Sequence, residues 1–158
     1  MIAIDDDKTT IRLTRGDNTD EYHRIAVIYP IWDYTQEKEI LYEFQLTDKI
    51  TFSVYDKKGY RKTPVFSKSF KLSDISYTTP TTSVEIPLSS TETKSFELLD
   101  KPKTYWYDIV LNDTTTILGY DEEGAKAIIV YPEAEEWLNE WCKIYILHRW
   151  YLYKRYGN

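Results

Sequence analysis

Cysteine, histidine and glycine are scarce in this chain of 158 residues. Its one cysteine, Cys142, excludes a disulfide within the chain and fits a reducing compartment of synthesis. Two His and five Gly leave little material for a metal cluster or a glycine-rich phosphate loop. No apolar run approaches the roughly 18 residues that span a bilayer. We therefore predict no metal, no cofactor and no membrane partner.

Positive charge is also in deficit. The chain has 20 Lys and Arg against 26 Asp and Glu, so its formal net charge is −6 at pH 7. A nucleic-acid partner needs a basic face for its phosphates, and the overall acidity argues against one. Residues 1–8 contain three consecutive Asp, where a signal peptide has a basic and then an apolar segment. We expect neither a nucleic-acid partner nor a secretion signal.

Aromatic side chains, in contrast, are abundant. The chain has 15 Tyr, 5 Trp and 5 Phe, and such residues pack well on pleated surfaces. Up to Pro132, short runs alternate apolar and polar residues between turn signals, which is typical of half-buried strands. The clearest runs are residues 11–14, 23–29, 39–46, 50–54, 65–72, 84–88, 103–111, 115–118 and 125–131. We predict one all-β domain over residues 1–132, a sandwich or barrel of about eight or nine short strands, with one helical turn after Ser89.

The segment after Pro132 has a different pattern. Residues 133–155 contain no Gly or Pro, and apolar residues recur at spacings of three and four, as on one face of a helix. Acidic residues come first and basic residues later, an order that complements the helix dipole. We predict one amphipathic helix over residues 133–156 as a second unit.

This predicted helix is too aromatic for a single contact face. Trp and Tyr are favoured anchors of protein interfaces, so we interpret the helix as a docking element. Burial of both helix faces within the same compact fold is the alternative. The predicted partner contacts are Trp137, Trp141, Tyr145, Trp150, Tyr151 and Tyr153.

Candidate catalytic and ligand-binding residues are few. Arg15, Gly16 and Asp17 spell the integrin-binding tripeptide, but a turn between strands explains them without a ligand. The acidic runs at residues 5–7 and 121–123 fit solvated charge better than a cation site or a carboxylate pair. The two histidines, at 23 and 148, lack a second metal ligand at a suitable spacing. We predict no catalytic and no metal-binding residue.

Several segments resemble a known family. Residues 11–17 and 46–54 look like the N-terminal module of phage baseplate upper proteins, and the likeness continues through three further segments, 84–88, 105–111 and 128–133. The resemblance covers about residues 8–133. It implies an immunoglobulin-like β-sandwich that fastens an appendage to a virion, and it brings no catalytic residues.

The resemblance and the aromatic segment together lead to one functional hypothesis. We expect a non-enzymatic virion structural protein that attaches a baseplate, tail or head fibre, or decorates the particle. Its partners would be capsid, connector, tail or baseplate proteins and further copies of itself, in a virion assembled in the host bacterial cytoplasm. Trp32, Tyr34 and Trp106 are secondary interaction candidates.

Two other classes of function stay open. In a carbohydrate-binding β-sandwich, exposed Tyr and Trp would stack on host-surface glycans. A small hydrolase or regulatory inhibitor would need, in its enzymatic form, a concave pocket with perturbed carboxylates or His, which we do not expect.

Overall fold

The structure, a computed structural model, describes residues 1–20, 22–59, 62–119 and 125–133, and its largest element is one seven-stranded β-sheet. Six strands follow one another in the order β1 (Ile2–Ile4), β2 (Ile11–Thr14), β11 (Lys126–Tyr131), β9 (Lys103–Leu111), β6 (Lys49–Tyr55) and β7 (Phe66–Lys71). A seventh strand, β10 (Thr115–Leu118), pairs with β9. The predicted all-β class is confirmed.

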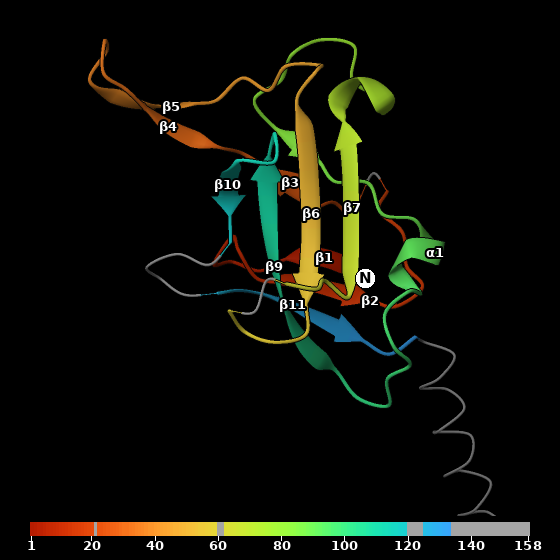
Figure 1. Cartoon of the computed structure of the whole chain (residues 1–158). Coiled ribbons are helices and arrows are strands. Elements are labelled where there is room, and N and C mark those ends of the chain that lie inside the picture. Colours follow the sequence, from red (N-terminus) through yellow and green to blue (C-terminus); the bar gives the residue numbers. More distant parts are fainter. Residues whose placement is uncertain (21, 60–61, 120–124, 134–158) are drawn as a thin grey trace, which may run out of the picture.

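The long strand β9 organises this sheet, because its two halves have different neighbours. Along one edge, residues 106–111 pair with β6. Along the other edge, residues 103–107 pair with β11 and residues 109–111 with β10. The sheet curls at β9, so that β6, β7 and β9 stand upright in Figure 1 while β1, β2 and β11 run across them. Its strand pairs are antiparallel except β2 with β11, which is parallel.

Alternate side chains of these strands form one apolar core, as the period of two predicts. On β9, every second residue from Tyr105 to Leu111 is buried. Phe52 of β6 is fully buried, and its ring centroid lies 5.7 Å from that of Tyr107. Burying an aliphatic or aromatic side chain of this size contributes about 1.5–3 kcal/mol to folding.

Four short strands lie outside the large sheet. β3 (Ala26–Val27) pairs with β8 (Val84–Glu85), and the valine of each belongs to the common core. β4 (Pro30–Asp33) pairs with β5 (Lys38–Leu41). The β4–β5 hairpin extends away from the body of the molecule in Figure 1.

Several strand predictions need correction, and the strand predicted over residues 84–88, for example, is only Val84–Glu85. The described residues form eleven strands, more than the eight or nine predicted, because strands of two to four residues are too short to show a period of two. The strand predicted over residues 23–29 shrinks to Ala26–Val27. The strand predicted over residues 39–46 ends at Leu41, because the backbone then turns inward to bury Phe44, which bridges to Thr81.

Helical structure is sparse in the described residues. A 3₁₀ turn, η1 (Leu72–Asp74), follows β7, and a short helix, α1 (Ser90–Thr93), begins where the sequence predicts it. The Ser89 side chain accepts a hydrogen bond from the Glu92 N–H, and Glu92 accepts one from the Ser89 N–H. In this part of the chain no helix has the length and apolarity to cross a membrane. The helix predicted over residues 133–156, with its six aromatic contacts, lies outside the described residues except for Glu133.

Candidate docking surface

The β4–β5 hairpin and its flanks, residues 28–43, form a projection that we call the arm. Every residue of the arm is exposed or half-buried, so neither face of this hairpin packs into the core. The exposed fraction is 54% for Trp32 and 86% for Tyr34, and Ile28 and Leu41 are also exposed. An isolated two-stranded hairpin is marginal in water, and exposed apolar residues gathered on one projection indicate an interaction surface.

Both faces of the arm carry apolar side chains. Trp32 lies opposite Glu39 and shares its face with Leu41, whereas Ile31 and Ile40 lie opposite each other on the other face. The arm is also acidic. It holds four carboxylates and one Lys, a net charge of −3. A surface complementary to the arm would therefore combine apolar side chains with positive charge.

The tip of the arm is shaped by its own hydrogen bonds. An oxygen of Asp33, Oδ1, accepts the backbone N–H groups of Thr35 at 2.8 Å and of Gln36 at 3.2 Å. Glu37 adopts a left-handed backbone conformation with φ of 51°. These contacts turn the chain back and leave the side chain of Tyr34 in solvent.

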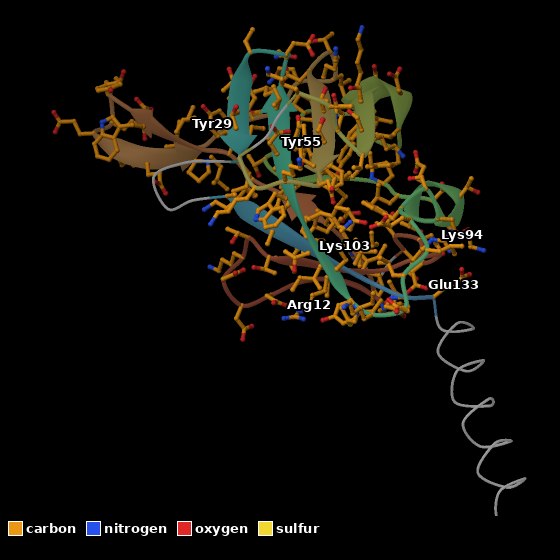
Figure 2. All side chains as sticks on the ribbon, turned by 60° about the horizontal axis from the view of Figure 1, so that its bottom comes forward. Arg12, Tyr29, Tyr55, Lys94, Lys103 and Glu133 are labelled. Carbon is orange, nitrogen blue, oxygen red and sulfur yellow. The ribbon has the colours of Figure 1, made fainter. Side chains whose placement is uncertain are left out.

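The root of the arm is attached to the body by aromatic contacts. The rings of Tyr29 and Tyr42 lie 5.8 Å apart, and Tyr42 contacts buried Phe44 edge to face at 5.2 Å. The Tyr42 N–H donates to the Tyr29 carbonyl at 2.8 Å. Figure 2 labels Tyr29 at this root. The arm therefore projects from a firmly packed base.

A buried carboxylate secures the same root. Asp48 accepts hydrogen bonds from the Tyr42 hydroxyl at 3.0 Å, the Gln45 N–H at 2.8 Å and the Asn112 side-chain amide at 2.8 Å. Burial alone would raise the pKa of Asp48, but these hydrogen bonds outweigh it and lower the pKa below its usual value. Burial and the hydrogen bond to Asp48 raise the pKa of the Tyr42 hydroxyl. Asp48 is thus an ionised structural group.

An apolar cavity of about 210 Å³ lies beside the root. Ile28 and Pro30 of the arm line one part of it, and side chains of β9 and β10 line another. Lys8 is its one charged lining residue. The cavity continues the apolar surface of the arm into the body of the molecule.

The three secondary candidates do not lie together. Trp32 and Tyr34 share the arm. Trp106 is half-buried in β9, where Tyr55 of β6 and Ala127 of β11 are its cross-strand neighbours. Trp106 is therefore a residue of the large sheet and contributes nothing to the arm.

The Arg-Gly-Asp tripeptide belongs to a clamp at the far side of the body. The Arg15 guanidinium donates to Glu133 at 3.1 Å and to the carbonyls of Phe96 and Lys94, both at 3.0 Å. Lys94 adds a second ion pair with Glu133 at 3.1 Å. The Arg15 side chain is only 13% exposed, so the structural interpretation of the tripeptide holds. Figure 2 shows Lys94 and Glu133 across the body from Tyr29.

A second charged cluster lies at the start of β9. Lys103 pairs with Asp56 at 2.9 Å and with Glu97, and its ammonium lies 4.8 Å from the Tyr105 ring centroid. The hydrogen bond from Lys103 is the main cause that lowers the pKa of Glu97, and the same bond raises the pKa of Lys103. A depression of about 370 Å³ adjoins the cluster. The paired charges join β9 to neighbouring loops.

The remaining candidates stand apart from one another. His23 contacts exposed Asp20 at 3.0 Å. The acidic run at residues 121–123 and His148 lie outside the described residues. Over the part of the chain that the structure describes, no three His, Cys, Asp or Glu side chains gather in a metal-binding arrangement. Comparisons with protein-family models, curated proteins and solved structures give no match to this chain.

The sequence predicted Trp32 and Tyr34 as interaction candidates but did not predict the projecting arm. The sequence does contain a pattern that indicates a hairpin outside the core. β4 and β5 each carry apolar residues at consecutive positions, Ile31 with Trp32 and Ile40 with Leu41. A strand with one buried face would alternate there.

Proposed function

We propose that this chain is a non-enzymatic structural protein of a bacteriophage particle. In this proposal it is an adaptor that attaches a baseplate, tail or head fibre, or decorates the particle. Its partners are capsid, connector, tail or baseplate proteins. The observation that carries the proposal is the arm, which presents Trp32 and Tyr34 to solvent from a base anchored by Asp48. A projecting hairpin on a well-packed β-sheet body suits a protein that connects neighbouring proteins of a particle.

The finer architecture belongs to the same proposal. The curled sheet, with β3 and β8 contributing to its core, corresponds in this proposal to the immunoglobulin-like sandwich that the resemblance implies. Residues 133–156 form the amphipathic docking helix, whose contacts are the six aromatics from Trp137 to Tyr153. Repeated copies on a symmetric particle make even a modest interface sufficient.

The test is the location of the protein. Antibodies raised against the purified chain are applied to phage particles from a lysate that contains it, and electron microscopy records the label. We expect label at repeated, symmetric positions and co-purification of the chain with particles through a density gradient. A chain that stays entirely in the soluble fraction contradicts the proposal.

One observation favours a second candidate, a carbohydrate-binding module. The rings of Trp32 and Tyr34 are exposed, as stacking on sugar rings requires. This candidate predicts retention on a column of host-surface glycans and loss of retention in Trp32→Ala. Passage through the column without delay, together with label on particles, favours the adaptor.

A further inference from the structure

The C-terminal part of the chain has the charge that the arm lacks. Residues 141–158 contain Lys143, Arg149, Lys154 and Arg155 and no Asp or Glu, a net charge of +4. The arm has a net charge of −3 and exposes Trp32, Tyr34 and two aliphatic residues. Both segments are rich in aromatic residues. They are therefore complementary in charge and alike in apolar character, as two halves of an interface are.

The last described residue before this segment lies far from the arm. The chain reaches its C-terminal segment through Glu133, which Arg15 and Lys94 hold beside α1. In both figures this point lies across the body from the arm. When the two surfaces that form an interface lie at opposite ends of a subunit, a pair of copies in contact still has one unused surface at each end. Further copies can then add to both ends.

We propose that residues 141–158 of one copy bind the arm of a second copy, so that copies assemble head to tail. This rests on the docking role of the C-terminal segment in the proposed function. Burial of Trp32, Tyr34 and Leu41 supplies the affinity, because large apolar side chains dominate interface energetics. The carboxylates of the arm and the cations of the segment fix the orientation and speed the encounter.

The sequence offers a charge-swap experiment on the full chain. The arm-reversed variant, Glu37→Lys with Glu39→Lys, changes the arm from −3 to +1. The segment-reversed variant, Arg149→Glu with Lys154→Glu and Arg155→Glu, changes residues 141–158 from +4 to −2. The matched control, Asp6→Lys with Asp100→Lys, alters net charge as much as the arm-reversed variant does. It does so at two exposed positions outside the arm.

Sedimentation measures the average mass of each sample against concentration. We expect the wild type to grow beyond a dimer with concentration, and less so in roughly 0.5 M NaCl because salt screens exposed charges. Each reversed variant should weaken association by about tenfold or more, while the control matches the wild type. An equal mixture of the two reversed variants should associate again, because each supplies the half that the other needs.

Three results overturn the inference: a wild type that stays monomeric at about 100 μM, an arm-reversed variant that associates like the control, or a mixture that fails to recover. Recovery in the mixture also shows that both variants are folded. Particle labelling separates this inference from the proposed function. If particles are labelled but association does not depend on charge, the adaptor proposal stands and its partner is another protein. If the chain associates with itself but no particle is labelled, the inference stands and the proposed function is wrong.

Discussion

Asp48 joins three parts of the chain through one carboxylate. It receives hydrogen bonds from Tyr42 at the arm root, from Gln45 beside it and from Asn112 after β9. Asn112 in turn accepts the Lys49 N–H at 2.9 Å. No other side chain of the same size offers two acceptor oxygens and no donor.

We predict that Asp48→Asn lowers the free energy of unfolding by about 2 kcal/mol, because an amide donor replaces one acceptor and leaves a neighbouring donor unpaired. Urea unfolding at pH 7 measures the loss. The control is Asp6→Asn at an exposed position, which should leave the midpoint unchanged. Equal midpoints for Asp48→Asn and the wild type contradict the structural role.

The same residue predicts a pH dependence. Hydrogen bonds lower the folded-state pKa of Asp48 below its unfolded value of 3.8. Its contribution is therefore fully present above that unfolded pKa and is lost as the pH falls through the folded pKa. The stability difference between wild type and Asp48→Asn should be constant above about pH 5 and shrink below about pH 3.9. A difference that grows on acidification contradicts this assignment.

Residue roles that depend on sequence neighbours were predictable from the sequence. Roles that depend on contacts between positions far apart in the chain were not. The turn at residues 15–18 follows from Gly16 and Asp17, and Gly16 indeed has φ of 89°. The contacts of Arg15 with Lys94 and Glu133, like those of Asp48 with Asn112, join positions far apart in the chain. Such pairs depend on how the strands are ordered in space, which a single sequence does not specify.

At the scale of elements, the capping box of α1 provides a test. We predict that Ser89→Ala lowers the free energy of unfolding by about 1 kcal/mol, because the Glu92 N–H loses its side-chain acceptor. Thr91→Ala, at an exposed position of the same helix, is the matched control and should change the unfolding midpoint little. A loss for Ser89→Ala no larger than that for Thr91→Ala would contradict the role of the cap.

The arm provides a second test at this scale. We predict that Trp32→Ser changes the free energy of unfolding by less than about 0.5 kcal/mol, because the side chain lies mostly in solvent. Phe52→Ala should cost about 3–5 kcal/mol, because it empties the centre of the core. Urea unfolding compares the free energies of unfolding of the two variants, at protein concentrations too low for self-association. A large loss from Trp32→Ser would mean that the arm is part of the folded core.

The regular pattern of the sequence predicted regular elements well. β9 runs from Lys103 to Leu111, as its alternation indicates, and β10 covers Thr115–Leu118. The pattern failed between residues 23 and 46, because the chain there leaves the core, forms the arm and returns. Alternation reports a half-buried strand, and the arm has no buried half.

At the scale of the whole molecule, composition predicted the class but not the arrangement. Abundant Tyr and alternating strands indicate an all-β chain. The parallel pairing of β2 with β11 brings the two ends of the described chain together, and it leaves the arm at the other side of the body. That placement separates the arm from Glu133, as the proposed contact between copies requires.

Removal of residues 134–158 tests the separation between body and docking segment. The core and the clamp of Arg15 and Lys94 with Glu133 lie within the first 133 residues. We therefore predict that the shortened chain unfolds cooperatively, with a free energy of unfolding within about 1 kcal/mol of the full chain. It should no longer associate with itself. Urea unfolding and sedimentation measure the two properties on the same samples.

A chain that also loses Pro132 and Glu133 is the matched control for this deletion. It lacks the carboxylate that forms ion pairs with Arg15 and Lys94, and it also lacks the buried Pro132. This control should be less stable than the chain that ends at Glu133, although neither associates. If removal of residues 134–158 alone unfolds the body, those aromatic side chains pack within their own chain, and they are then not available for the arm of a neighbour.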